Sequence, residues 1–143
     1  MTTKIAIAGA KGRMGRNLIK SGLSNSHTAI VGVFDISEIE QVFLDEMNLS
    51  HEIATTREHS FERADVIIDF TSPKSLFAFT ESAVSSKSGL VIGTTGLEEQ
   101  HFNLLKQTGN STKVFYAPNM SFGVNSFFNI ARKAASYLKN FDI

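Results

Sequence analysis

Short apolar runs alternate along the chain with longer segments of helical periodicity. The runs are continuous and rich in β-branched side chains, which is typical of strands that are buried on both faces of a sheet. Strands are therefore expected at residues 5–8, 29–34, 66–70, 90–92 and 113–117. The stretch 48–63 has the least regular pattern, and within it residues 53–56 suggest a further short strand.

The segments between these runs predict helices. They are expected at residues 13–23, 37–47, 73–87, 97–107 and 124–138. Ser37 followed by Glu40 suggests a capping box for the second helix. Thr71 or Ser72 is expected to cap the third, and Gly109 to end the fourth.

Strands and helices thus alternate from one end of the chain to the other. This alternation predicts an α/β fold, a Rossmann-like doubly wound parallel sheet with helices on both faces. The pattern shows no repeat, low-complexity segment or internal linker, so residues 1–143 are expected to form one dinucleotide-binding domain.

Composition removes several classes of function. The chain has 143 residues, a net charge of zero and no cysteine, which excludes disulfides and thiol chemistry and gives no basic face for nucleic acid. No apolar run approaches the roughly 18 to 20 residues of a membrane span. A cytoplasmic protein with neither a nucleic-acid nor a membrane partner is expected. The four histidines, His27, His51, His59 and His101, are scattered, and no metal site is expected.

A glycine-rich turn follows the first strand. Gly9 permits a tight turn, Gly12 allows the backbone to approach a pyrophosphate, and Gly15 allows the next helix to pack closely on the strand. The phosphates would then meet the free N–H groups at the start of that helix. Lys11 and Arg13 lie inside the turn and are expected to contact phosphate, the alternative being a solvated basic patch.

The second strand ends at Asp35, twenty residues after Gly15. A carboxylate at this position accepts hydrogen bonds from the hydroxyls of an adenosine ribose. It would also repel a 2′-phosphate, so the expected cofactor is NAD(H), with NADP(H) accepted if Lys11 and Arg13 reach it.

Three later strands end in loops of unusual sequence. The chain carries G-A-K-G-R-M-G-R at 9–16, V-I-I-D-F-T-S-P at 66–73, V-I-G-T-T-G at 91–96 and A-P-N-M-S-F-G-V-N at 117–125. Together, in this order and at this spacing, they resemble dihydrodipicolinate reductase, an enzyme of lysine and diaminopimelate synthesis in bacteria and plants. The resemblance spans the chain except for residues 38–63.

The resemblance implies a role for each matching position. In the family's pattern, the pyrophosphate turn would be formed by Gly12, Arg13 and Met14, and the adenosine ribose would be bound by Asp35. The cleft would be lined by Phe70 and Thr71, and the nicotinamide ribose and carboxamide would lie against Gly93 and Thr95. The nicotinamide ring would be bordered by Ala117, Asn119 and Met120, and the substrate would be faced by Thr94 and Thr95. Asp69 could orient the cleft.

The resemblance also implies a second domain that would hold a small dicarboxylate substrate. Its motif, of the type E-x-H-H-x-x-K-x-D-x-P-S-G-T, does not occur in this sequence, which ends at Phe141-Asp142-Ile143. No catalytic residue is therefore assigned, and the expectation is a chain that binds dinucleotide but turns substrate over poorly by itself.

Three alternatives remain. The chain could be the cofactor domain of another dehydrogenase, although the G-T-T-G and A-P-N-M-S loops argue against it. It could be a non-catalytic dinucleotide-sensing module, or a remnant whose loops bind nothing. Apolar residues around 124–128 and 137–141 also suggest a homo-oligomer.

Overall fold

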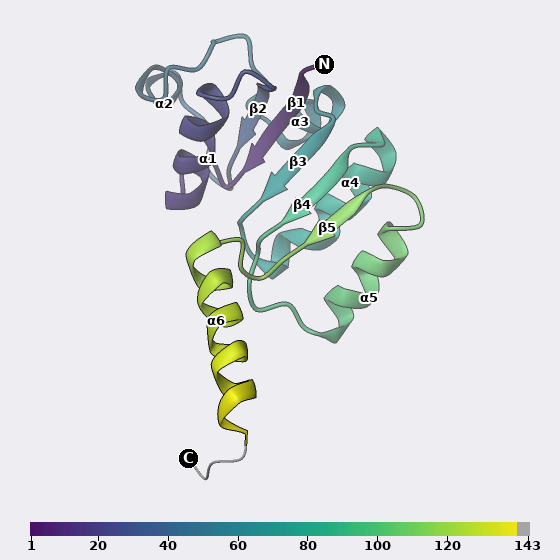
Figure 1. Ribbon diagram of the computed structural model, residues 1–143. Helices are drawn as coiled ribbons and strands as arrows, with labels where there is room; N and C mark the ends of the chain where they lie inside the picture. The colour runs from purple at the N-terminus through teal and green to yellow at the C-terminus, as the bar shows by residue number, and fades with distance from the viewer. Residues whose placement is uncertain (140–143) are drawn as a thin grey trace.

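The computed structural model describes residues 1–139 and contains a five-stranded parallel sheet flanked by helices (Figure 1). In chain order the elements are β1 (Thr3–Ala8), α1 (Arg13–Leu23), β2 (Thr28–Phe34), α2 (Gln41–Glu46), α3 (Arg57–Arg63), β3 (Val66–Asp69), a 3-10 turn (Pro73–Ser75), α4 (Leu76–Ser86), β4 (Gly89–Ile92), α5 (Glu99–Thr108), β5 (Val114–Tyr116) and α6 (Phe122–Leu138). The five predicted strands and the parallel α/β class are confirmed.

The strand order is β2-β1-β3-β4-β5. A sixth position exists at the outer edge of β2, where Ala54 forms an isolated parallel bridge with Gly32. If this bridge is counted as a third strand in sequence, the order becomes 3-2-1-4-5-6, that of dinucleotide-binding domains. The chain reverses its direction of travel across the sheet between β1 and β3, and ligands bind outside the carboxyl ends of the strands at such a point.

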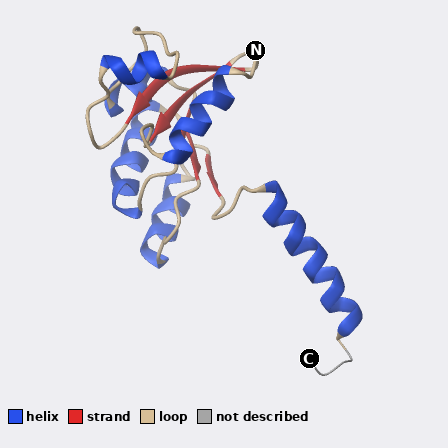
Figure 2. Cartoon of the chain, turned by 90° about the vertical axis from the view of Figure 1, so that its left-hand side faces the viewer, coloured by secondary structure: helices blue, strands red, loops and turns tan. Residues whose placement is uncertain are grey.

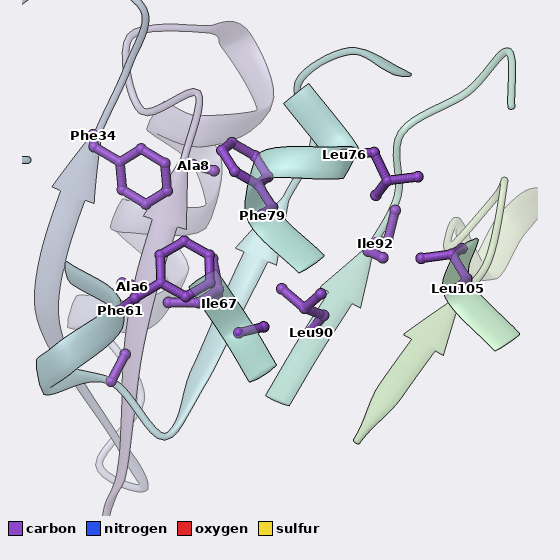
Figure 3. Packing of buried hydrophobic residues seen from close by; sticks show 12 residues of the cluster. Ala6, Ala8, Phe34, Phe61, Ile67, Leu76, Phe79, Leu90, Ile92 and Leu105 are labelled. Atoms are coloured by element: carbon purple, nitrogen blue, oxygen red, sulfur yellow. The ribbon is translucent and has the colours of Figure 1, made fainter. Parts of the chain in front are cut away.

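Two apolar layers hold the helices against the sheet. The layer shown in Figure 3 joins α3, α4 and α5 to one face through residues such as Phe61, Leu76 and Leu105. The other joins α1 and α2 to the opposite face through residues such as Ile19 and Phe43. Side chains of β1 alternate between the layers, as the pleat of a strand requires.

Coverage of the two faces is unequal. Helices α1 and α2 lie over β1 and β2, whereas Phe115 in β5 is 57% exposed. Helix α6 extends away from the sheet in both views and contains no buried residue (Figures 1 and 2). Within the described residues, no helix has the length and apolar character needed to cross a bilayer. The predicted oligomer patch at 137–141 lies partly outside the described residues, because the structure describes only its first three positions.

The segment 48–63 differs most from the prediction. The strand expected at 53–56 is reduced to the single bridge at Ala54, and an unpredicted helix, α3, follows it. Helix α3 is stabilised mainly by tertiary packing, because Phe61 packs against Phe34 and Phe79 with ring centroids 6.1 Å from each. Its polar surface gave the sequence too little periodicity to predict it.

Of two predicted caps, the first is wrong and the second is confirmed in position only. Helix α2 begins at Gln41 with Glu40 as its N-cap, so Ser37 and Glu40 form no capping box there. The turn after β3 is a short 3-10 helix with Ser72 as its N-cap residue and Pro73 next, as predicted, but the Ser72 side chain makes no cap hydrogen bond. Thr71 instead donates its hydroxyl to Asp69. The strand's own carboxylate thus takes the hydroxyl that was expected to cap the helix.

Candidate functional site

The glycine turn joins the ends of two neighbouring strands. Gly9 has a positive φ of 71°, which favours glycine over any residue with a Cβ. The N–H groups of Gly9 and Ala10 both donate to the carbonyl oxygen of Phe34, at 2.9 and 3.2 Å. The turn is therefore fixed to the carboxyl end of β2, beside Asp35.

The other two glycines allow close approach. A Cβ at Gly15 would lie 2.6 Å from Ala10 Cα and closer still to the Gly9 carbonyl, so the start of α1 packs directly on the turn. Gly12 is the N-cap of α1, and within the described chain no side chain caps this helix and no acid lies in its first turn. Its first N–H groups are thus available to an anion.

Asp35 is held rigidly at the end of β2. Its Oδ2 accepts the N–H of Lys11 at 2.9 Å, and its Oδ1 accepts the N–H of Ile36 at 2.7 Å. A carboxylate has about four lone-pair positions, so two backbone bonds leave capacity for hydroxyl donors. The glycine turn and the carboxylate are therefore one hydrogen-bonded unit.

A cavity of about 820 Å³ opens beside this unit. Its lining includes Gly9, Lys11, Gly12, Asp35, Phe70 and Thr71, all of which the sequence singled out. Phe34 and Phe79, which pack edge to face at 5.6 Å, contribute an apolar wall. A volume of this size, with an apolar wall and polar groups placed around it, is typical of a small-molecule site.

The other predicted residues lie outside this cavity. Arg13, Met14 and Gly15 form the first turn of α1, Gly93 to Thr95 follow β4, and Ala117, Asn119 and Met120 follow β5. One contact links the groups, because a Cβ at Gly93 would lie within 2.7 Å of Phe70 Cδ1. The Phe70 ring therefore packs on the Gly93 backbone, between the cavity and the β4 loop.

Thr94 and Thr95 have opposite environments. Thr95 is exposed, whereas Thr94 is 2% exposed and its hydroxyl, which lies near Asp69, makes no hydrogen bond of good geometry with the described residues. Asn119 is half-buried, and its Oδ1 accepts the N–H of Ser121 at 2.9 Å. The loops after β4 and β5 thus carry a mixture of open and internally engaged groups.

Asp69 is a buried carboxyl at the end of β3. Its Oδ1 accepts the N–H and hydroxyl of Thr71 at 2.8 and 2.6 Å, while Oδ2 has no hydrogen bond of good geometry within the described chain. Burial raises the pKa of Asp69, and hydrogen bonds from Thr71 and, more weakly, the neighbouring Thr94 hydroxyl oppose this shift. The carboxyl therefore orders the loop that carries Phe70 and Thr71.

Sequence reasoning missed one wall of the cavity. Thr55, Thr56, Arg57 and Glu58, at the start of α3, all line it. The available signal was Thr56, because threonine is favoured as the N-cap of a helix and could have marked the start of α3. In the structure Thr56 Oγ1 accepts the backbone N–H of His59 at 3.4 Å.

The histidines make local contacts. His51 pairs with Asp45 at 2.7 Å, and His101 Nδ1 accepts the N–H of Glu98 at the start of α5. Over residues 1–139, the structure groups no three histidine or acidic side chains in a way that could hold a metal ion.

Comparison with known proteins places this architecture in one family. The family described as "Dihydrodipicolinate reductase, N-terminus" matches residues 3–120. A 4-hydroxy-tetrahydrodipicolinate reductase of Campylobacter jejuni (serotype O:6) is 39% identical over 140 residues, which cover 98% of this chain and 51% of that protein. One of Wolbachia from Brugia malayi is 31% identical over 147 residues, covering 98% of this chain and 54% of that protein. The chain spans about half the length of these curated relatives.

Solved structures agree with this result. A dipicolinate-bound dihydrodipicolinate reductase from Paenisporosarcina sp. TG-14 superposes with a TM-score of 0.73 at 26% identity, over 96% of this chain and 55% of that one. A myo-inositol 2-dehydrogenase from Lactobacillus plantarum gives 0.68 at 14% identity, over 100% and 43%, and shows the fold alone. Since the family matches well over half of the chain, this protein belongs to the dihydrodipicolinate reductase family, in which it corresponds to the N-terminal domain.

Proposed function

We propose that this chain binds a nicotinamide dinucleotide, with NADH preferred and NADPH accepted, in the cavity beside the glycine turn. The observation that carries the proposal is Asp35, whose carboxylate is fixed at the cavity wall by the N–H groups of Lys11 and Ile36. A fixed acceptor beside an apolar slot suits an adenosine, whose ribose hydroxyls donate and whose base is flat.

The remaining cofactor contacts follow from the strand ends. The pyrophosphate would lie on the first turn of α1, at Gly12, Arg13 and Met14, with Gly9 and Gly15 shaping the backbone and Lys11 adding charge. The adenosine would lie between Asp35 and the Phe34–Phe79 wall. Phe70 and Thr71 would border the middle of the cofactor, which then extends toward the loops after β4 and β5.

The nicotinamide end would lie at Gly93, Thr95, Ala117, Asn119 and Met120. The relatives are named 4-hydroxy-tetrahydrodipicolinate reductases, and for the whole protein we propose the reaction of its family, reduction of the dihydrodipicolinate ring in lysine biosynthesis. The bound nicotinamide supplies hydride. Thr94 and Thr95 would face the substrate, although Thr94 is buried here and would need the β4 loop to move.

We further propose that residues 1–143 alone turn substrate over poorly. Hydride transfer needs an acceptor held in reach of the cofactor and a group that supplies a proton. The two loop segments assigned to the nicotinamide end, residues 93–96 and 117–125, contain no lysine, arginine or histidine that could bind a small dicarboxylate. The chain corresponds to the N-terminal half of its relatives, and it is the dinucleotide site that this half contains.

Calorimetric titration with NADH and, separately, NADPH tests binding. We expect dissociation constants from micromolar to sub-millimolar, with NADH equal or tighter, and no heat with either cofactor would refute the proposal. A steady-state assay with substrate and NADH tests turnover, and a rate near that of a full-length family member would contradict the second claim.

A further inference from the structure

Arg57 and Glu58 form an ion pair on the wall of the cavity that the sequence analysis missed. Both residues line the cavity, and Arg57 donates from Nε and Nη2 to Glu58 Oε1 at 3.0 and 2.7 Å. Two of the five N–H donors of the guanidinium therefore meet one carboxylate oxygen of the adjacent residue.

The position of this pair is fixed by packing beneath it. Ser60 lies against Gly32, where a Cβ would come within 2.5 Å of Ser60 Oγ, so α3 approaches β2 more closely than any other residue at position 32 would allow. Phe61 anchors the same helix in the Phe34–Phe79 cluster. The first turn of α3 is thereby held at the end of β2, on the same cavity as Asp35.

The charges that line the cavity leave no free cation on the α3 side. Its charged residues, as far as the structure describes them, are Lys11 and Arg57 on the positive side and Asp35, Glu38 and Glu58 on the negative side. While Glu58 neutralises Arg57, the remaining charged residues of the lining are one cation, Lys11, and two carboxylates, Asp35 and Glu38. A dianionic 2′-phosphate entering this space would meet net repulsion, whereas a ribose hydroxyl could donate to a carboxylate acceptor such as Asp35.

The pair is easy to open. The side chains of Arg57 and Glu58 are 39% and 61% exposed, and ion pairs with such exposure contribute little to stability. Backbone hydrogen bonding and, next, the Arg57 hydrogen bond lower the pKa of Glu58, so Glu58 is ionised near neutral pH. Arginine would bind a phosphate in bidentate fashion if it were released.

We propose that the Arg57–Glu58 pair determines cofactor selectivity: Glu58 withholds the Arg57 guanidinium from the 2′ position of the adenosine ribose and so favours NADH over NADPH. This inference rests on the proposed function, because it concerns the same cavity. It assigns a role in cofactor selectivity to residues other than Asp35, the acidic residue after β2. It also makes the preference for NADH depend on an ion pair that one substitution opens.

The test is the ratio of the dissociation constants for NADPH and NADH, measured by calorimetry on the whole chain. Four proteins complete the cycle: wild type, Glu58→Gln, Arg57→Gln and the double variant. We expect Glu58→Gln to lower the ratio about fivefold when Arg57 is present, the equivalent of about 1 kcal/mol. In the Arg57→Gln background the same change should alter the ratio less than about twofold.

Glu62→Gln is the matched control. It removes the same charge from the same helix, is exposed, and lies outside the cavity, so the ratio should not change. An equal shift in both backgrounds, or the same shift in Glu62→Gln, would overturn the proposal, because charge alone would then explain the effect. NADH binding with an unchanged ratio in Glu58→Gln overturns this inference only, whereas no binding of either cofactor by the folded wild type overturns the proposed function with it.

Discussion

The two sides of the site are built differently. The cavity side, at the ends of β1, β2 and β3, is closed by backbone hydrogen bonds, by Asp35 and by a cluster of three phenylalanines. The open side, formed by the loops after β4 and β5, lies next to α6, which has no buried residue. A ligand gains affinity where groups are fixed before it arrives. Under the proposed function, the cavity side therefore supplies most of the affinity of this chain.

The largest expected effect concerns the turn that creates the cavity side. Gly15→Ala would place a Cβ against the Gly9 carbonyl and Ala10, which are backbone atoms that cannot move aside. We expect a loss of about 3 kcal/mol in the free energy of unfolding, measured by urea denaturation.

Gly123→Ala is the control for this change. Gly123 is also helical, and a Cβ there would meet only Ser121 Oγ at 3.9 Å, so stability should stay equal or rise by up to about 1 kcal/mol. Equal losses for both variants would show that close packing of α1 on the turn is unimportant.

The sequence predicted this turn because its glycines have local causes. Gly9 is required by a positive φ, Gly12 lies at an exposed helix start, and Gly15 is required by the close approach of α1 to the turn. All three requirements act within seven residues. Asp35 was equally predictable, since it ends a strand at a known spacing. The parallel fold followed in the same way from continuous apolar runs.

Helix α3 could not be predicted because its causes are distant in the sequence. Its buried face is set by Gly32 and by phenylalanines from β2 and α4. The helix has only 7 residues, about two turns, which is too short to show a clear apolar periodicity. The third strand position shows the same limit, because Ala54 pairs only where β2 leaves an edge free. The cavity wall that carries Arg57 and Glu58 was missed for this reason.

A second, smaller effect would test whether the cavity side carries the binding. Asp35→Asn keeps the size of the side chain but removes its charge and one acceptor. We expect the affinity for NADH to fall about tenfold, the cost of about one hydrogen bond to a charged group. Asp45→Asn, on the exposed pair with His51, is the control and should leave calorimetric affinity unchanged.

Asp69 lies between the two sides, and its burial predicts that the stability of the folded protein depends on pH. Because burial raises the pKa of Asp69, the folded state holds this proton more tightly than the unfolded chain, and stability falls as the pH rises above the unfolded value. Asp69→Asn cannot ionise, and its amide oxygen can still accept from Thr71.

The variant and wild type should therefore have similar melting temperatures below about pH 4, and the variant should be the more stable by about pH 8. Thermal unfolding across this range measures the difference, which should persist in high salt because the group is buried. A difference that is constant with pH would show that Asp69 is ionised in the folded protein without cost.

The smallest effect is expected on the open side, at Asn119. Its side-chain oxygen is already engaged by the Ser121 N–H in the turn before α6, so it has less capacity for a ligand than Asp35 has. We expect Asn119→Ala to weaken NADH binding less than about threefold, and to cost about 1 kcal/mol or less in stability from the lost hydrogen bond. Calorimetry measures the change in affinity, and urea denaturation of the same samples measures the change in stability. If Asn119→Ala instead weakened binding as much as Asp35→Asn, the loops after β4 and β5 would already be organised for the nicotinamide, and the difference between the two sides would be one of exposure and not of affinity.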